Sequence, residues 1–373
     1  MTYRLETNIA QIGNRSEKET GTVSTPIYLS TAYRHEGLGK STGFDYSRTS
    51  NPTREIVESS LADLEKGDEA FAFSSGMAAI QCILSLFQSG DELIVSEDLY
   101  GGTYRLFQHY EHQYEITFHY VDTSNKELVG KKINENTKAI FVETPTNPLM
   151  KETDLKEIAK LTEQNNLLLL VDNTFCTPVI QQPISEGADI VIHSATKYLG
   201  GHNDVLAGAV IAVGEEICNK LRDYQNAAGA VLSPFDCWLL IRGIKTLTLR
   251  VREQEKNAKQ IAQFLREHPL ITDVFYPNKG GMLSFRIQKE EWIAPFLEKL
   301  QLITFAESLG GVESFITYPA TQTHADIPES VRIEKGICNR LLRFSVGIEH
   351  IDDLLEELKT VLSKVEEEVV TYE

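Results

Sequence analysis

The sequence predicts an α/β protein with a mostly parallel, seven-stranded sheet, followed by a smaller C-terminal α+β domain. Short apolar runs alternate with segments of helical spacing over most of the chain. Several runs are apolar throughout, which is typical of strands covered on both faces. After about residue 230 the pattern changes to shorter strands between helices. The seven apolar runs span residues 70–73, 92–95, 116–121, 139–143, 167–171, 189–192 and 207–213.

The first elements along the chain follow from composition and capping residues. Residues 1–45 are rich in Thr, Ser, Gly and Arg without a clear period, so we expect an extended arm. A helix should begin at Asn51 and Pro52, because Asn is a good N-cap and Pro suits the first helical position. It should end at Gly67. Further helical spacing covers residues 77–87 and 155–164.

The C-terminal part reads as a separate α+β unit. One long helix is expected over residues 246–265, followed by three short strands at 282–287, 314–317 and 341–346. Helices are expected at 291–300 and 351–365. We therefore divide the chain into the arm, a large domain over 46–235 and a smaller domain over 236–373 that includes the long linking helix.

Charge and cysteine content exclude several classes of protein. The 373 residues carry a formal net charge of −18, which disfavours nucleic acid and anionic membranes as partners. The longest aliphatic run, residues 167–171, is too short for a membrane span, and the first residues lack a signal-peptide pattern. The five cysteines include no Cys-x-x-Cys pair, so we expect reduced thiols in a cytoplasmic protein.

Four polar clusters follow predicted strands, where sheets of this kind bind ligands. Residues 74–79 place small residues at a helix start, which leaves N–H groups free to bind an anion. In residues 143–148, two prolines bracket Asn147 and aim its amide. Taken alone, each of these two clusters is more simply an ordinary turn.

The other two clusters contain ionisable side chains. Asp172 ends an apolar strand, so it needs a cationic or donor partner unless it caps the next segment. Lys197 follows another strand, where desolvation would lower its pKa and make the amine a nucleophile, although a surface lysine fits equally well. Ser194 and Thr196 add hydroxyls. Together the four clusters suit pyridoxal 5′-phosphate (PLP), which needs donors for its phosphate, a carboxylate for its ring nitrogen and a lysine for its aldehyde.

Six stretches are also similar to a known family: residues 46–48 (Tyr-Ser-Arg), 74–79 (Ser-Ser-Gly-Met-Ala-Ala), 99–105 (Leu-Tyr-Gly-Gly-Thr-Tyr-Arg), 143–148 (Glu-Thr-Pro-Thr-Asn-Pro), 172–174 (Asp-Asn-Thr) and 193–201. They resemble the transsulfuration (Cys/Met metabolism) family of PLP-dependent enzymes, and within it the bacillar cystathionine γ-synthase/O-acetylhomoserine thiolyase group. The resemblance covers nearly the whole chain and implies PLP-dependent fold type I, which is aspartate-aminotransferase-like.

The resemblance implies a role for each matching residue. Lys197 forms the Schiff base with the cofactor, Asp172 pairs with the pyridine nitrogen, and Tyr100 stacks on the ring. Arg343 binds the substrate α-carboxylate through two parallel hydrogen bonds. The cofactor-binding residues are Tyr46, Arg48, Gly76, Met77, Tyr100, Asn147, Asp172, Thr174, Ser194, Thr196 and Lys197. The substrate-binding residues are Arg343, Ser308, Glu307, Thr323, Arg105 and Asn147.

The resemblance also implies shared active sites and a reaction. Tyr46 and Arg48 would reach the phosphate bound by a neighbouring subunit, so we expect active dimers paired into a homotetramer. In this family a Glu at position 307 goes with γ chemistry. We therefore expect γ-replacement on an O-activated homoserine, with cysteine giving cystathionine or sulfide giving homocysteine. Cystathionine γ-lyase and β-lyase activities are the alternatives, and a catalytically silent PLP-fold binding protein is a more distant one.

Three other types of site are weaker interpretations. Ser194 and Lys197 match a Ser-x-x-Lys nucleophile, but the companion Ser-Asp-Asn and Lys-Thr-Gly tripeptides are absent. The Gly-x-Gly-x-x-Gly of a Rossmann oxidoreductase is also absent after the first strand. His109, His112 and His119 could in principle bind a metal, yet the polar residues around the first two indicate a solvated helix end. We expect no metal site.

Overall fold

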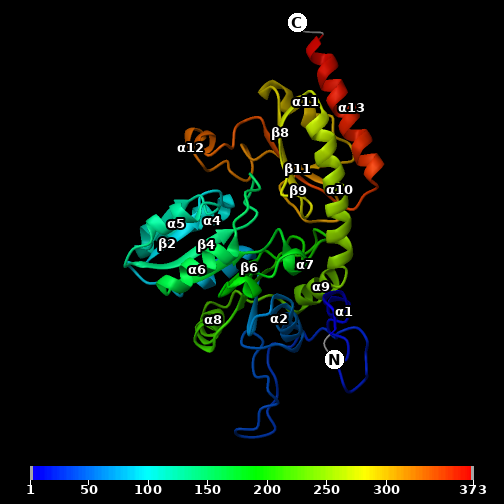
Figure 1. Cartoon of the computed structure of the whole chain (residues 1–373). Helices are drawn as coiled ribbons and strands as arrows, with labels where there is room; N and C mark the ends of the chain where they lie inside the picture. Colours follow the sequence, from blue (N-terminus) through cyan, green and yellow to red (C-terminus); the bar gives the residue numbers. More distant parts are fainter. Residues whose placement is uncertain (1–2, 371–373) are drawn as a thin grey trace.

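The computed structural model describes residues 3–370, which form two sheets connected by a long helix (Figure 1). Within these residues the larger sheet has seven strands in the order β1-β7-β6-β5-β4-β2-β3. Strand β7 is antiparallel to both neighbours and the other pairs are parallel, so the predicted mostly parallel sheet is confirmed. The strands are β1 (Glu69–Phe73), β2 (Glu92–Ser96), β3 (Thr117–Val121), β4 (Thr137–Glu143), β5 (Leu168–Asp172), β6 (Ile190–His193) and β7 (Gly208–Ala212).

Both faces of this sheet are buried, which explains the continuous apolar runs. Successive strand residues point to opposite faces. In β5, Leu169 and Val171 enter the core on one face, whereas Leu170 enters the core on the other. The first face is covered by α2 (Pro52–Glu65), α6 (Leu155–Asn165) and α9 (Pro234–Ile244), and the second by α3 (Gly76–Leu84), α4 (Gly101–Tyr114) and α8 (Glu215–Ala228).

The smaller sheet follows in the C-terminal part, in the order β10-β11-β12-β9-β8. One helix, α10 (Leu247–Glu267), serves both cores: Val251 near its start packs with the larger sheet, and Ile261 packs with the smaller one. In Figure 1, α10 runs alongside α13 (Ile351–Val370). The strands are β8 (Ile271–Phe275), β9 (Met282–Ile287), β10 (Thr304–Phe305), β11 (Phe315–Thr317) and β12 (Leu341–Ser345).

The remaining elements are short. They are α1 (Leu5–Ala10), α5 (Lys126–Lys132), α7 (Thr177–Ile180), η1 (Pro183–Glu186), η2 (Glu290–Trp292), α11 (Ile293–Glu298) and α12 (Glu329–Glu334). The helix expected over residues 291–300 is thus divided into η2 and α11. Pro295 lacks an N–H donor, and it falls in the first turn of α11, where that donor is not needed. No helix within residues 3–370 is long and apolar enough to cross a membrane.

The N-terminal arm is extended as expected, except that its first residues form α1. Ile9 of α1 is buried in the core of the large sheet, and Glu6 forms an ion pair with Arg252 of α10. This short helix was not predicted, because six residues are too few to show a helical period. Between α1 and α2 the chain loops away from the body of the protein (Figure 1), and Leu29 and Leu38 on it are exposed.

Asn51 connects the arm to α2 and caps that helix, as predicted. Its side-chain oxygen accepts the N–H groups of Thr53 and Arg54 at 3.0 and 3.4 Å. Its side-chain amide donates to the carbonyl oxygen of Tyr28 at 2.9 Å, and the whole residue is buried. One side chain therefore satisfies both the helix start and the arm.

We expect Asn51→Ala to lower the free energy of unfolding by about 2 kcal/mol or more, because it removes a cap and leaves buried polar groups unpaired. The matched control is Asn125→Ala, which removes the cap of α5 on an exposed surface and should cost about 1 kcal/mol or less. Urea unfolding followed by circular dichroism measures both. Equal losses in the two variants would contradict a linking role for Asn51.

Candidate active site

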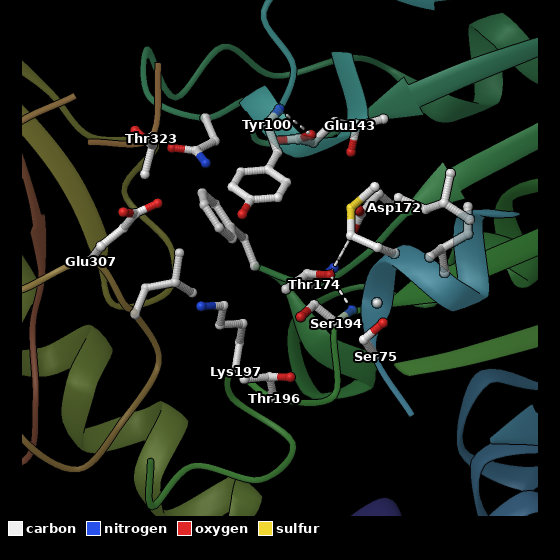
Figure 2. Close-up of a pocket in the computed structure, with 18 of the residues that line it drawn as sticks. Ser75, Tyr100, Glu143, Asp172, Thr174, Ser194, Thr196, Lys197, Glu307 and Thr323 are labelled. Carbon is white, nitrogen blue, oxygen red and sulfur yellow. Dashed lines mark hydrogen bonds between the residues drawn. The ribbon is translucent and has the colours of Figure 1, made fainter. Parts of the chain in front are cut away.

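A cavity of about 180 Å³ opens at the carboxyl ends of the central strands of the large sheet. Residues from both sheets line it, so its walls are far apart in sequence. The predicted site residues on its wall are Gly76, Met77, Tyr100, Asn147, Asp172, Thr174, Ser194, Thr196, Lys197, Glu307, Thr323 and Arg343. Figure 2 shows Lys197, Glu307 and Tyr100 pointing into the same space from different sides.

Lys197 follows β6 on a turn and extends its amine into the cavity (Figure 2). Burial, reinforced by the positive charge of Arg343, lowers the pKa of Lys197 to about 8. Its Nζ atom lies 3.5 Å from Oγ of Ser308, a neutral hydroxyl. The predicted desolvation of this lysine is therefore confirmed, and about a tenth of the amine is uncharged at pH 7, far more than for an ordinary lysine.

Two carboxyl groups end neighbouring strands, at Asp172 on β5 and Glu143 on β4. Burial raises the pKa of Asp172, while the hydroxyl and N–H of Thr174 oppose this by donating to Oδ1 at 2.5 and 3.0 Å. Burial and the negative charge of Asp172 hold the pKa of Glu143 well above its usual range. Because two adjacent buried carboxylates do not both ionise readily, Glu143 holds a proton more readily than Asp172 does.

The start of α3 forms the anion-binding end of the cavity. Ser75 caps this helix by accepting the N–H of Ala78 at 3.1 Å, and the N–H groups of Gly76 and Met77 lie in the unpaired first turn. A Cβ atom on Gly76 would come within 2.9 Å of the Ser194 side chain, so only glycine fits there. The hydroxyl of Thr196 bonds to the main chain of Ala207, at 3.1 Å to its oxygen and 3.0 Å to its nitrogen.

Tyr100 precedes α4 and places its ring in the upper part of the cavity (Figure 2). Its N–H donates to Oε2 of Glu143 at 3.1 Å. The ring folds back over Gly102, where a Cβ atom would approach it to 2.5 Å. Burial, followed by the charge of Glu307, raises the pKa of the Tyr100 hydroxyl. The ring is therefore a rigid, uncharged wall of the site.

Arg343 enters from β12 of the small sheet and is almost completely buried. Its guanidinium donates to Oδ1 of Asn147 at 2.9 Å, and to the Ser308 carbonyl oxygen and Thr317 Oγ1 at 3.1 and 3.0 Å. These acceptors are neutral, and Nε has no partner in the described part of the chain. Burial lowers the pKa of Arg343 to about 10, so the group stays cationic at neutral pH. An unneutralised buried guanidinium fits a carboxylate ligand.

Four predicted residues are not part of the wall of this cavity: Ser308, Arg105, Tyr46 and Arg48. Ser308 is nevertheless next to it, because its hydroxyl lies 3.5 Å from Nζ of Lys197. Arg105 is mostly exposed and forms an ion pair with Asp326. Tyr46 and Arg48 are on the arm, where the Arg48 guanidinium lies 5.5 Å from the centre of the Tyr46 ring and its Nε donates to Asn226 at 3.4 Å. Within one chain the other three residues are therefore not brought to Lys197.

The cavity wall also contains residues that the sequence did not single out for a role: Ser75, Ile80, Thr103, Glu143, Pro145, Phe175, Ile192, Leu206 and Leu309. Glu143 had a usable signal, since it ends an apolar run next to the Asn147 turn. Phe175 directly follows the Asp172–Thr174 stretch. Leu206 and Leu309 carry no sequence signal, because isolated apolar residues in loops are common.

The three histidines considered for a metal do not form a cluster. His119 bonds to Oε2 of Glu92 at 2.6 Å, and His109 lies edge-on to Tyr110 and Tyr114. Within residues 3–370, no group of three or more His, Cys, Asp or Glu residues has the arrangement of a metal site.

We expect Arg343→Ala to lower kcat/KM by about 30- to 1,000-fold, the loss of a bidentate contact worth about 2–4 kcal/mol, while the cofactor stays bound. Arg343→Lys should recover only part, because an ammonium group cannot form two parallel hydrogen bonds. The control is Arg286→Ala on the adjacent strand β9, where the arginine pairs with Asp273. Steady-state kinetics and the visible cofactor spectrum decide the result. Loss of the cofactor together with activity would assign Arg343 to the fold.

The chemistry of these groups fits a phosphate-bearing aldehyde cofactor. A buried lysine with a lowered pKa can bind the aldehyde covalently. The Asp172 carboxylate can pair with a protonated ring nitrogen, and the glycine cradle at the start of α3 can hold a phosphate. These are the requirements of PLP.

Comparison with known proteins agrees with this fit. Residues 6–363 match the model of the Cys/Met metabolism PLP-dependent enzyme family. The cystathionine gamma-synthase/O-acetylhomoserine (thiol)-lyase of Bacillus subtilis is 64% identical over the full length of both chains. The cystathionine gamma-synthase of Haemophilus influenzae is 59% identical and covers 95% of this chain and 97% of its own.

Solved structures show the same fold. The cystathionine gamma synthase of Xanthomonas oryzae, solved in complex with aminoacrylate and cysteine, is 37% identical. The match has a TM-score of 0.96 and covers 98% of this chain and 99% of that one. Sequence, cavity and fold therefore place this chain in the Cys/Met metabolism PLP-dependent enzyme family.

Proposed function

We propose that this protein catalyses PLP-dependent γ-replacement on an O-activated homoserine in methionine biosynthesis. The sulfur compound that replaces the γ substituent is either cysteine, which gives cystathionine, or sulfide, which gives homocysteine. The observation that carries the proposal is the full-length identity of 64% to a cystathionine gamma-synthase/O-acetylhomoserine (thiol)-lyase. The cavity supports it, because Lys197, Asp172 and Arg343 supply a base, a counter-ion and a carboxylate anchor in one place.

The protein would hold PLP with residues at or after the ends of five strands, β1, β2, β4, β5 and β6. Lys197 would attach it covalently, Asp172 would pair with its ring nitrogen, and Tyr100 would stack on its ring. Gly76, Met77 and the hydroxyls of Ser194 and Thr196 hold its phosphate, and Asn147 and Thr174 complete the wall. When bound, PLP supplies an electron sink for negative charge that develops on the substrate Cα.

The chain's own residues then bind the substrate and move its protons. Arg343 binds the α-carboxylate, which orients Cα toward the Lys197 amine. The free Lys197 amine takes the Cα proton on Nζ, because its lowered pKa makes it a base near neutral pH. γ-Replacement needs a second proton loss, from Cβ, before the γ substituent leaves. The same amine can take that proton once it has released the first one.

Glu307 favours γ chemistry over β-elimination in this proposal. Its carboxylate lies on the cavity wall opposite the ring-binding side (Figure 2), where the distal end of a substrate held by Arg343 would lie. Ser308 and Thr323 adjoin the same region, and Thr323 is held by a 2.8 Å hydrogen bond to His324. Arg105 would approach from the cofactor side only if its ion pair with Asp326 opens.

The test is a direct assay of the acetyl, succinyl and phosphoryl esters of homoserine, each with cysteine and with sulfide. The expected result is cystathionine or homocysteine from at least one ester, at a rate above that of cystathionine cleavage. Faster release of cysteine and 2-oxobutanoate from cystathionine would favour the γ-lyase alternative, and release of homocysteine and pyruvate the β-lyase alternative. Absence of all turnover in PLP-loaded protein would favour a silent binding protein.

The arm supports a shared active site. Tyr46 and Arg48 lie beside a hollow bounded by Gly229 and Pro234, away from the Lys197 of their own chain. We propose that they complete the phosphate site of a second copy, and that two such dimers form a homotetramer. We also propose the division into an arm (1–45), a large domain (46–235) and a small domain (236–373). The presence of two sheets supports it, although most of α9, together with Val251, lies beyond residue 235 and packs against the large sheet. The five free thiols support a cytoplasmic location.

Mixing the inactive variants Arg48→Ala and Lys197→Ala should restore activity if the site is shared. Random re-pairing makes half of the dimers mixed, each with one intact site of two, so about a quarter of wild-type activity is expected. Subunit exchange is followed by native mass spectrometry. Lack of recovery after demonstrated exchange would show that each site is built within one chain.

A further inference from the structure

A buried ionic cluster lies behind Asp172, outside the wall of the cavity. It consists of Glu65 at the end of α2, His193 at the end of β6, and Asn173 directly after β5. Glu65 Oε1 lies 2.6 Å from Nε2 of His193 and accepts the side-chain amide of Asn173 at 2.8 Å. The His193 and Glu65 side chains are 1% and 0% exposed. One carboxylate thus holds the ends of two adjacent strands.

These two strand ends carry the main cofactor-binding residues. Asn173 is the next residue after Asp172, and His193 precedes the turn that carries Lys197. On the cavity side the strand ends are already joined, since the Thr174 hydroxyl donates to Asp172 and accepts the Ser194 N–H at 2.9 Å. Glu65 makes the corresponding connection on the far side. Asp172 is therefore fixed from both sides.

The cluster is costly to bury, which argues that it has a purpose beyond packing. Oε2 of Glu65 and Nδ1 of His193 have no hydrogen-bond partner in the part of the chain that the structure describes. Buried ion pairs often add little to stability compared with apolar residues of similar size. A pair retained at this position therefore points to a function that depends on its charge.

The groups around Asp172 indicate that this function is to favour the ionised form of its carboxyl group. Glu143 on β4 is a second acid beside it, so ionisation of both is unfavourable. Thr174 donates two hydrogen bonds but carries no charge. A positive charge on His193 lowers the pKa of Asp172, against the effect of burial and beside the donors of Thr174. Glu65 places a carboxylate oxygen 2.6 Å from Nε2 of His193, so a positive charge on the imidazole has a partner in this buried place.

We propose that Glu65 and His193 are positioning residues that keep Asp172 ionised and in place, and thereby keep the pyridine nitrogen of the cofactor protonated. The inference rests on the proposed role of Asp172 at that nitrogen. It assigns no contact between the cluster and the cofactor or substrate. The two residues act through Asp172.

The experiment uses protein loaded with PLP labelled with ¹⁵N in its ring, without substrate. The double variant Glu65→Gln/His193→Gln removes both charges and leaves an amide pair that can still hydrogen-bond, so it should fold. We expect its ring ¹⁵N signal to move from the protonated toward the unprotonated position at pH 7.5, and the Kd for PLP to rise by about tenfold. The single variant Glu65→Gln should shift the signal in the same direction.

The matched control is Glu58→Gln, which neutralises another largely buried carboxylate on α2. Glu58 accepts the N–H of Ala72 at 2.8 Å and pairs with Arg54, away from both strand ends. This control should keep the wild-type ¹⁵N signal and PLP affinity. Asp172→Asn provides the signal of a site that has lost its carboxylate.

The outcomes separate this inference from the proposed reaction. A wild-type ¹⁵N signal in the double variant would overturn the role of the cluster, even if the enzyme performs γ-replacement. A wild-type signal in Asp172→Asn as well would instead overturn the role of Asp172. Because no substrate is present, the absence of γ-replacement activity would not alter either measurement.

Discussion

Lys197→Ala should lose covalent cofactor binding, the associated visible absorption band and turnover together. General acid–base catalysis alone is worth about 10²- to 10⁴-fold, so kcat should fall by at least that amount. No other residue on the cavity wall is a lysine within the described part of the chain. Borohydride reduction of the wild-type protein followed by peptide mapping should therefore locate the cofactor on Lys197.

The control for this prediction is Lys279→Ala. Lys279 is also partly buried, but its amine pairs with Glu152 and its pKa is raised above the usual range, because the favourable charges and hydrogen bond outweigh burial. The Lys279→Ala variant should keep the visible absorption band of the bound cofactor and wild-type turnover. Label on any lysine other than 197 would contradict the assignment.

The same lysine predicts a dependence of stability on pH in the protein without cofactor. Its folded pKa of about 8 lies below the usual value of 10.5, so the charged form is disfavoured by folding. The unfolded chain then binds more protons between these pKa values, and stability rises with pH across that window. Below a pH of about 8 the wild-type protein must bury a charged amine, whereas the Lys197→Met variant does not. The variant without cofactor should therefore unfold at a higher temperature than the wild type.

Asp172→Ala should weaken PLP binding and lower kcat/KM by at least about 100-fold, a range typical for loss of one preorganised electrostatic contact. In the proposed site the carboxylate would keep the ring nitrogen protonated, and without it the cofactor would accept negative charge from Cα less well. Asp172→Asn preserves the shape but not the charge, so it should also be severely impaired. Equilibrium dialysis of PLP and steady-state kinetics measure the two effects.

Asp189→Asn is the matched control for Asp172. Asp189 lies at the opposite end of the same pair of strands, where its carboxylate accepts the N–H of Leu169 at 2.7 Å. Burial also raises its pKa, so the two carboxyls share an environment but not a location. The control should retain activity. Near-wild-type turnover in Asp172→Asn would show that another group keeps the ring nitrogen of PLP protonated.

Local pattern was sufficient to predict elements that are strongly apolar or well capped. The strands around Leu170 and Ile192 and the helix starting at Asn51 are examples. Strand β8 was missed because its residues are only partly buried and its middle residue is Asp273. Helix α8 was not predicted, although Ile217, Cys218, Leu221 and Tyr224 recur at helical spacing and pack against the core.

The sequence by itself determined the class of fold and the chemical types at the strand ends: a lysine, an aspartate, hydroxyls and a glycine-bearing helix start. Family resemblance added Arg343, Tyr100 and Glu307. Only the tertiary structure decided that these side chains line one cavity, that Arg105 lies apart from it in an ion pair with Asp326, and that Glu65 of α2 joins the ends of β5 and β6. The physical reason is that burial and charge set the reactivity of ionisable groups, and both depend on neighbours brought from distant parts of the chain. The pKa of Lys197 is lowered mainly by burial in the cavity and then by the charge of Arg343, which comes from the other sheet.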